Sequence, residues 1–344
     1  MRSIYGLTLD DLGQYFIEHN EKPYRKTQIY EWLYRHNIRD FSQMTNQKKE
    51  IIELLKEDFD LDYLELVERQ IAQDKTEKFL FRLKDGSLIE SVLMNHNYGN
   101  SVCVTSEVGC NMGCQFCASG MYKKKRNLLP EEMVLQILTI SQIIGKRISH
   151  IVVMGIGEPF DNYDNVIKFL HIVNEPIGLE IGARHISIST CGLVPKIYDF
   201  AEEKLQSNLA ISLHAPTDEI RNKIMPINKV YPLDKLVPAI KDYIAKTNRR
   251  VTLEYILINE LNDSKEASLA LAKLIRGLNV YVNLIPYNEV KEKPFKRSTK
   301  ERMTTFYKTL KERGINVTLR MEFGSDIDAA CGQLRSKRIK GEKD

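Results

Sequence analysis

The sequence predicts an α/β protein built as a partial (β/α)6 barrel, with a small helical N-terminal domain and a linking β-hairpin. Apolar, β-branched runs alternate with amphipathic helices through six rounds after residue 98, which is typical of a parallel sheet buried on both faces. Residues 1–75 instead have helical, polar patterning, and two alternating runs flank Asp85-Gly86, the signature of a hairpin turn. We therefore expect an accessory domain over 1–75, the hairpin over 76–97, the barrel with a C-terminal loop over 98–335, and a basic tail over 336–344.

The N-terminal domain is predicted from three amphipathic segments. Thr8 and the acidic residues after it suit a helix start, residues 27–34 place apolar groups on one face, and residues 47–55 do the same. After them the period changes to two, over residues 78–83 and 87–94, as expected for the two strands of the hairpin.

The barrel is preferred over a doubly wound sheet because polar groups follow strand after strand. The expected strands are 101–105, 150–154, 185–189, 208–214, 250–257 and 281–286, with a short extended segment at 316–320. The polar groups at their carboxyl ends are residues 110–117, 155–158, 189–192, 212–214 and 286–288. Sites assembled from many successive strand ends are the habit of a barrel, and six rounds rather than eight predict an open one.

Composition narrows the class of protein. The chain has 344 residues, 43% of them hydrophobic and 28% charged, and its formal net charge is only +4. The net charge therefore does not indicate nucleic-acid binding, and any nucleic-acid site must come from local clusters of basic residues. No apolar run approaches the length of a membrane helix and the first residues do not resemble a signal peptide, so we expect a cytoplasmic protein that does not enter a membrane.

Three of the six cysteines lie within eight residues, at Cys110, Cys114 and Cys117. Such crowding in a chain of this size indicates metal binding or catalysis rather than a disulfide framework. A structural zinc site would need a fourth ligand from elsewhere, and nothing nearby repeats a Cys-x-x-Cys pair. A [4Fe–4S] cluster held by three thiolates would leave one iron open to a small molecule.

This loop, with Phe116 before the last cysteine, resembles the radical S-adenosylmethionine (radical SAM) enzymes. In that superfamily three cysteines hold a [4Fe–4S] cluster whose free iron binds S-adenosylmethionine (SAM), and one electron cleaves the SAM sulfonium to a radical. Residues 154–159 (Met-Gly-Ile-Gly-Glu-Pro) resemble the segment that contacts the methionine end of SAM. Taken alone, such a segment is often only a glycine-rich turn with a capping glutamate.

Within that superfamily the chain is similar to the RlmN/Cfr family of RNA methyltransferases over nearly its whole length. The resemblance implies methylation of C2 of an adenine in 23S rRNA and in tRNA, with one cluster and two SAM molecules per turnover. The alternative within the family is methylation of C8 of the ribosomal adenine, which gives antibiotic resistance. The further motifs are residues 109–114, 126–128, 211–215, 225–228 and 324–334.

The resemblance gives two further cysteines a chemical role. It makes Cys331 the residue that accepts a methyl group from SAM and becomes transiently crosslinked to the RNA, and Cys103 the residue that releases the product by forming a disulfide with Cys331. Glu90 matches a family glutamate proposed as proton acceptor, so Cys103 and Glu90 compete for that role. Cys103 alone would more often be a buried small hydrophobe, and we expect Cys191 to pack near the cofactor without taking part in chemistry.

The resemblance also names the residues that bind SAM. Their hydroxyl, imidazole, amide and carboxylate groups suit the ammonium, carboxylate and ribose of that molecule. A lone strand-end histidine would more often be a structural one, but here it belongs to a converging set. The predicted set is Gly157, Glu158, Ser189, Ser212, Leu213, His214 and Asn288.

Contacts with 23S rRNA and tRNA are expected on local basic clusters, although charge runs are usually only solvated faces. Residues 123–126 beside the cysteine loop are the best candidates, followed by 22–26, 291–297 and 337–340. The N-terminal domain is either an RNA-docking module or only a cap on the barrel. We further expect an electron donor such as flavodoxin or ferredoxin, and a monomer. The competing hypothesis is a non-catalytic RNA-binding protein stabilised by a metal.

Overall fold

The computed structural model describes residues 2–320, 327, 329 and 333. In this part of the chain the strands are β1 (Arg2–Ser3), β2 (Phe59–Asp60), β3 (Glu65–Ile71), β4 (Glu77–Arg82), β5 (Leu88–His96), β6 (Gly99–Cys103), β7 (Glu107–Val108), β8 (Arg126–Asn127), β9 (His150–Val153), β10 (Ile186–Thr190), β11 (Asn208–Ser212), β12 (Val251–Leu257), β13 (Val280–Pro286) and β14 (Val317–Leu319). The helices are α1 (Leu9–Glu18), α2 (Arg25–Tyr34), α3 (Lys49–Asp58), α4 (Pro130–Ile144), α5 (Tyr163–Asn174), α6 (Val194–Glu202), α7 (Asp218–Ile224), α8 (Leu233–Thr247), α9 (Lys265–Leu274) and α10 (Lys300–Glu312).

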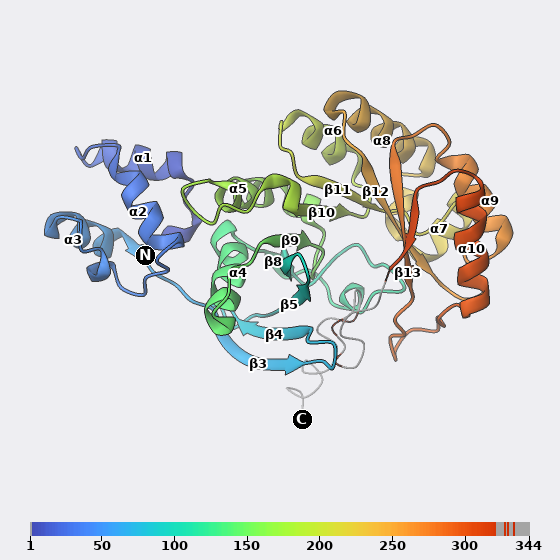
Figure 1. The fold of residues 1–344 in the computed structure, drawn as a ribbon, viewed down its shortest axis with the longest axis horizontal. Coiled ribbons are helices and arrows are strands. Elements are labelled where there is room, and N and C mark those ends of the chain that lie inside the picture. Colours follow the sequence, from blue (N-terminus) through green and yellow to red (C-terminus); the bar gives the residue numbers. More distant parts are fainter. Residues whose placement is uncertain (1, 321–326, 328, 330–332, 334–344) are drawn as a thin grey trace.

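One open sheet organises the molecule. Within the described residues it has ten strands in the order β14-β13-β12-β11-β10-β9-β6-β5-β4-β3. In this sheet β6 and β9 to β14 run parallel to one another, whereas β3, β4 and β5 form an antiparallel extension at one edge. Helices separate the parallel strands and lie along the outside of the curved sheet (Figure 1). The predicted partial barrel is confirmed, and β14 is the short extended segment expected after the sixth round.

The hairpin is formed by β4 and β5 around Asp85-Gly86. Gly86 adopts a φ of +78°, which glycine tolerates best, and the Asp85 carboxylate accepts the backbone N–H of Ser87 at 2.9 Å. The hairpin does more than link two parts, because β5 also pairs with β6 and so continues the barrel sheet.

The helical patterning predicted to about residue 75 ends earlier. The last helix of the N-terminal module, α3, ends at Asp58, and residues 65–71 form β3. This strand exposes most of its side chains and pairs with β4, whose Phe79 and Phe81 are fully buried. Its polar sequence therefore lacks the regular alternation that marks a half-buried strand, and the partner strand determines its conformation.

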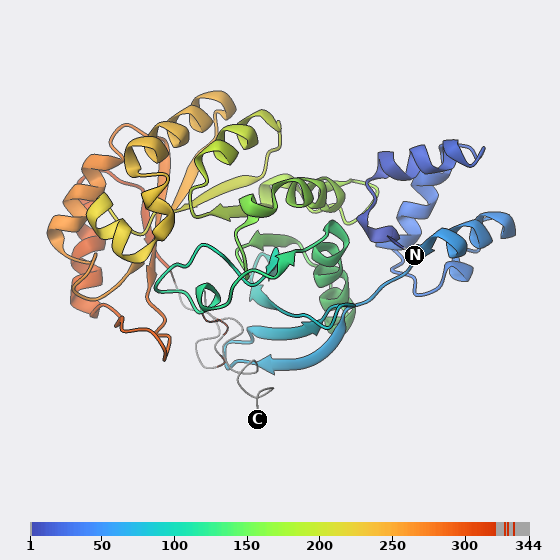
Figure 2. The ribbon, with the colours of Figure 1, turned by 180° about the vertical axis from the view of Figure 1, so that it is seen from behind.

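The N-terminal module packs against the outer helices of the barrel at one end of the molecule (Figures 1 and 2). Thr8 caps α1 through a capping box with Asp11, as its position predicted. Asp11 also pairs with Lys168 of α5 at 2.8 Å, and Arg35 donates to the Pro176 carbonyl oxygen at 2.8 Å. Local charge and backbone contacts thus fix the module beside α4 and α5.

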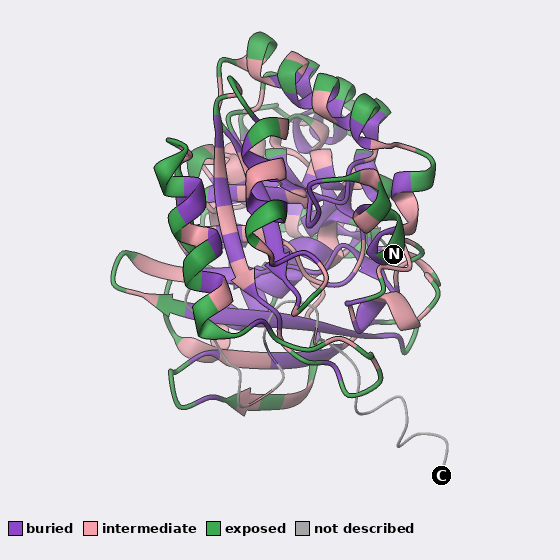
Figure 3. Cartoon of the chain, turned by 90° about the vertical axis from the view of Figure 1, so that its right-hand side faces the viewer, coloured by how far each residue is buried: buried purple, intermediate pink, exposed green. Residues whose placement is uncertain are grey.

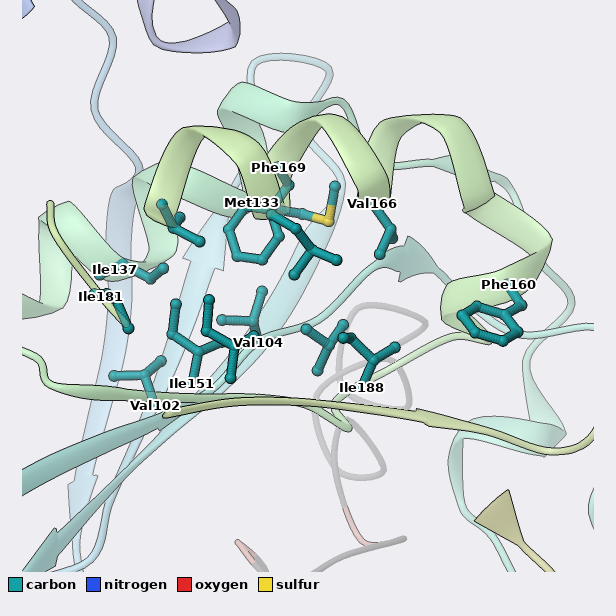
Figure 4. Packing of buried hydrophobic residues seen from close by; sticks show 14 of the residues in the cluster. Val102, Val104, Met133, Ile137, Ile151, Phe160, Val166, Phe169, Ile181 and Ile188 are labelled. Carbon is teal, nitrogen blue, oxygen red and sulfur yellow. The ribbon is translucent and has the colours of Figure 1, made fainter. Parts of the chain in front are cut away.

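The main core lies between the sheet and the helices that cover it. Figure 3 shows helices whose inward surfaces are buried and whose outer surfaces are exposed, the pattern of an amphipathic helix on a sheet. Figure 4 shows Val102, Ile151 and Ile188 of three neighbouring strands facing Met133 of α4 and Phe169 of α5, and all five side chains are fully buried. No helix in the described part of the chain is long and apolar enough to cross a membrane.

Candidate active site

A cavity lies at the carboxyl ends of the parallel strands, where the loops after successive strands converge. Its wall combines the three thiols with the backbone of the Gly155–Glu158 segment and with polar side chains of β10, β11 and β12. Of the residues predicted from the sequence, those that line it are Cys110, Cys114, Cys117, Gly157, Glu158, Ser189, Ser212 and His214.

The two ends of the cysteine loop are joined by a short antiparallel pair of strands, β7 and β8. Cys110 donates its backbone N–H to the Tyr122 carbonyl at 2.9 Å, which brings the two sides of the loop together. Gly109 has a φ of +80°, and a Cβ there would lie 2.3 Å from the Lys123 carbonyl oxygen. Only glycine fits this approach. The loop therefore has a defined shape that aims its thiols at the cavity.

The chemistry of the thiols suits a metal cluster. All three are free cysteines, and burial raises the pKa of Cys110 to about 12. Burial likewise raises the pKa of Cys114 well above its usual range, while the Arg221 guanidinium opposes that shift. Among the described residues, no group of three His, Cys, Asp or Glu side chains is arranged to hold a single metal ion. Three free thiols that line one cavity are the donor type that attachment of a [4Fe–4S] cluster by three cysteines requires.

Glu158 is a buried residue of the cavity wall. One carboxylate oxygen accepts the N–H of Cys191 at 2.7 Å, and the other accepts the N–H of Phe160 at 3.0 Å. Burial raises the pKa of this carboxyl, and the backbone donors pull it back down. The two bonds fix the carboxylate while leaving lone pairs for a ligand. A positively charged ammonium group from a cofactor would compensate its charge.

Glu107, which sequence reasoning missed, supports the Gly155–Glu158 segment through a backbone hydrogen bond. Its side chain is fully buried, accepts the N–H of Glu158 at 3.0 Å and pairs with Lys124 at 2.6 Å. Lys124 also contacts Asp161 at 2.7 Å. Burial raises the pKa of Glu107 to about 7 against the attraction of the Lys124 ammonium. One acid thus joins the cysteine loop to the Gly155–Glu158 segment.

His214 is a neutral donor at the cavity wall. Its Nδ1 lies 3.1 Å from the backbone N–H of Ile256 and accepts it, so the proton of the neutral ring is on Nε2. Burial lowers the pKa of the imidazole to about 3, and its ring packs edge-to-face on Phe116. Asn262 holds the His214 carbonyl oxygen at 2.7 Å. The arrangement presents an N–H to a ligand across the physiological pH range.

The remaining predicted cofactor residues divide into two groups. The Ser189 and Ser212 hydroxyls lie 3.4 Å apart on neighbouring strands. Leu213 is buried in the main core, and Asn288 is half-buried in the segment after β13. Neither side chain belongs to the described residues that line the cavity. Their predicted contact with SAM stays a prediction.

The sequence reading also missed Glu254 and Arg320. Both line the cavity, and Glu254 accepts a hydrogen bond from Asn283 at 2.8 Å. Burial raises the pKa of Glu254, and the Arg320 charge lowers it. A glutamate within the apolar strand β12 was a signal that could have revealed this position.

Two of the three predicted catalytic residues, Cys103 and Glu90, lie on the inner face of the sheet. Cys103 ends β6 and packs with Val92 and Met94 of β5 and with Ile156. Glu90 is on the same face of β5 as Val92 because strand side chains alternate, and its carboxylate lies 3.8 Å from Lys78. Ala329 joins the Cys103 cluster. Cys331 itself lies outside the described residues, as does the basic cluster 337–340.

The described basic clusters are largely occupied by acids. Arg126 makes a bidentate pair with Glu132, at 2.7 Å to each oxygen, and also contacts Asp85. Single ion pairs join Lys26 to Asp10 and Lys296 to Glu289. Lys123 and Lys125 are exposed beside the cysteine loop, and Lys125 lies 3.8 Å from the Asp85 carboxylate and donates to the Ser87 hydroxyl at 2.9 Å.

Comparison with known proteins identifies the family of the chain. Residues 105–272 match the family model of the radical SAM superfamily, and residues 3–61 match that of the ribosomal RNA large subunit methyltransferase N-terminal domain. A "Probable dual-specificity RNA methyltransferase RlmN" of Spiroplasma citri is 56% identical, covering 98% of both chains. The protein of that name from Geobacillus kaustophilus (strain HTA426) is 55% identical, covering 99% of this chain and 94% of its own. The chain belongs to the RlmN family of radical SAM RNA methyltransferases.

A solved structure supports the family assignment. A radical SAM methyltransferase from Sphaerobacter thermophilus superposes with a TM-score of 0.92 at 42% identity, covering 97% of this chain and 99% of the other. Membership of the RlmN family implies a [4Fe–4S] cluster and SAM as cofactors. The three thiols and the polar cavity wall fit both groups.

Proposed function

We propose that this RlmN-family protein methylates C2 of an adenine in 23S rRNA and in tRNA. The observation that carries the proposal is the cavity itself, in which three thiols face Glu158, His214 and two serines from neighbouring strand ends. The names of the relatives support RNA and dual specificity as the substrate class. The preference for C2 over C8 rests on resemblance to those relatives.

Cys110, Cys114 and Cys117 would hold one [4Fe–4S] cluster, and Gly157, Glu158, Ser189, Ser212 and His214 would hold SAM, with Leu213 and Asn288 as outer contacts. When bound, these groups supply a one-electron cleavage of the SAM sulfonium. Glu158 would accept hydrogen bonds from the ammonium, and the Nε2 proton of His214 would bond an oxygen. Phe116 and Met225 line the same cavity and would keep water from it.

Methyl transfer to an adenine carbon would use Cys331 as the methyl carrier, so that two SAM molecules are consumed per turnover. A carbon in the adenine ring is too weak a nucleophile to take a methyl group directly from a sulfonium. The transferred carbon would transiently crosslink Cys331 to the RNA. Cys103 would then attack the Cys331 sulfur, so that a disulfide forms while the bond between that sulfur and the transferred carbon breaks and the product is released. Either Cys103 or Glu90 would accept the ring proton, and both are buried on the inner face of the sheet.

The partners follow from this chemistry. RNA would approach the cavity beside exposed Lys123 and Lys125, and the N-terminal module would add contacts far from the thiols. An electron donor such as flavodoxin or ferredoxin would reduce the cluster. We propose a cytoplasmic monomer.

The decisive measurement is mass spectrometry of nucleosides from 23S rRNA fragments and tRNA treated with the reconstituted, oxygen-free protein. We expect 2-methyladenosine in both RNAs and none with Cys331→Ala, although that variant should retain iron and bind SAM. Formation of 8-methyladenosine alone would overturn the C2 assignment. RNA binding with no reductive cleavage of SAM would instead favour a non-catalytic RNA-binding protein.

A further inference from the structure

Arg221 is a fully buried charged side chain on α7, below the cavity. It donates hydrogen bonds to the backbone oxygens of Leu213, Cys191 and Ser212, at 3.0, 2.7 and 3.2 Å. Its remaining bond, at 2.8 Å, goes to the side-chain oxygen of Asn228. These four acceptors are uncharged, so hydrogen bonding stabilises the guanidinium without cancelling its charge.

The acid that interacts with this cation lies one residue further away. Asn228 accepts from Arg221 and donates to Asp218 at 2.8 Å, so the amide separates the two charges. Asp218 in turn accepts the N–H of Leu233 at 2.9 Å. A buried charge without a direct counterion is costly unless another negative group is near. A negative group on the other side of the guanidinium would therefore stabilise Arg221.

The side of the guanidinium away from Asn228 is the side of the cysteine loop. Cys191, whose carbonyl Arg221 holds, lines the cavity together with Cys114. The helix that carries Arg221 meets the cysteine loop directly, since Gln115 donates its N–H to the Ile224 carbonyl at 2.9 Å. The buried cation of Arg221 therefore lies beside the loop that carries the three thiols.

We propose that Arg221 is a positioning residue that sets the reduction potential of the cluster bound by Cys110, Cys114 and Cys117. A three-thiolate cluster becomes more negative when it accepts one electron. A fixed buried cation stabilises that reduced form more than the oxidised one, because electrostatic effects are strong where water is excluded. The inference rests on the proposed three-cysteine attachment but not on the position of the methylated carbon.

The test is a redox titration of the reconstituted protein, followed by the electron paramagnetic resonance signal of the reduced cluster. Arg221→Gln should lower the ratio of reduced to oxidised cluster at least about tenfold at a given potential, which is about 59 mV for one electron. Arg221→Lys, which keeps the charge, should stay within about threefold of the unmodified protein. A neutral variant with an unchanged potential would overturn the proposal.

Two further variants separate charge from structure. Asn228→Asp brings a carboxylate against Arg221 without removing the guanidinium, so it should lower the potential as Arg221→Gln does. If Arg221→Gln fails to retain iron, Asn228→Asp tests the proposal in its place. Asn262→Ala removes uncharged bonds from the same strand ends and should leave the potential unchanged. An equal shift in Asn262→Ala would show a structural effect and contradict the proposal. A protein with no C2 methylation but with these shifts would refute the proposed function alone.

Discussion

At the scale of single residues, Gly157 in the wall of the cavity leaves no room for a side chain. Gly157 has a φ of +110°, and a Cβ there would lie 2.6 Å from Cγ of buried Glu107. Gly157→Ala should therefore lower SAM affinity at least about tenfold, which is about 1.4 kcal/mol, and equilibrium binding would measure it. Gly86→Ala is the matched control because its φ is +78° but nothing lies within 4 Å. Equal losses in the two variants would mean that backbone strain alone is responsible.

His214 gives a second prediction at this scale, on pH. Its folded pKa of about 3 lies below the ordinary histidine value, so the unfolded chain binds more protons between the two values. The stability that the neutral ring contributes is complete above pH about 6.5 and is lost as the pH falls toward 3. As the pH decreases, we expect the free energy of unfolding to fall more steeply in the unmodified protein than in His214→Asn. The difference in slope should reach about 1.4 kcal/mol per pH unit.

Urea unfolding at pH 4.5, 5.5 and 6.5 would measure that difference in slope. Asn suits the left-handed backbone of His214, whose φ is +56°, and its amide oxygen can accept the Ile256 N–H. The raised pKa of Glu107 acts in the opposite direction over the same range, but it is common to both proteins and cancels. His171→Asn, at an exposed position of α5, serves as control. Parallel slopes for His214→Asn and the unmodified protein would contradict the assignment.

At the scale of elements, the cysteine loop and the Gly155–Glu158 segment form one unit through the pair Glu107–Lys124. Removing Lys124 leaves a fully buried carboxylate facing no cation, whereas removing the Glu107 charge leaves Lys124 paired with Asp161. Lys124→Met should therefore lower the free energy of unfolding by about 3 kcal/mol, and Glu107→Gln by less. The double variant should recover part of the loss.

A double-mutant cycle in urea would measure this coupling. The exposed pair Lys196–Asp199, at 2.8 Å, offers a matched control in which coupling should stay below about 1 kcal/mol. Additive effects of the Glu107 and Lys124 substitutions would show that the two segments are independent.

At the scale of the whole molecule, the sequence predicted what depends on local pattern. β-branched runs such as 150–154 and 281–286 identified the parallel strands, and the spacing of Cys110, Cys114 and Cys117 identified the loop. It missed Glu107, Arg221 and Glu254 because charged residues are usually exposed, and only the folded chain shows the partners that surround these three. It missed β3 because an exposed edge strand takes its conformation from its neighbour.

The arrangement of the two parts of the molecule leads to the last prediction. Gly6 of the N-terminal module lies against α4 of the barrel, where an added Cβ would lie 2.4 Å from a carboxylate oxygen of Glu131. Gly6→Val should lower the free energy of unfolding by about 1 kcal/mol, at the low end for overpacking, because the end of the flexible Glu131 side chain can move aside. SAM affinity should be unchanged, because the cavity is lined by residues of the barrel and its loops. If the module docks RNA, methylation of tRNA should fall while SAM binding persists.

The matched control is Gly182→Val, since Gly182 has an ordinary φ of −53° and its nearest neighbour, His185, is 4.0 Å away. Thermal unfolding, SAM binding and tRNA methylation at saturating SAM would be compared for the two variants. A loss of SAM affinity in Gly6→Val would mean that the module supports the cavity through α4. Undiminished methylation in a destabilised Gly6→Val protein would instead favour the cap hypothesis, in which the module covers the barrel and leaves recognition of RNA to the loops around the thiols.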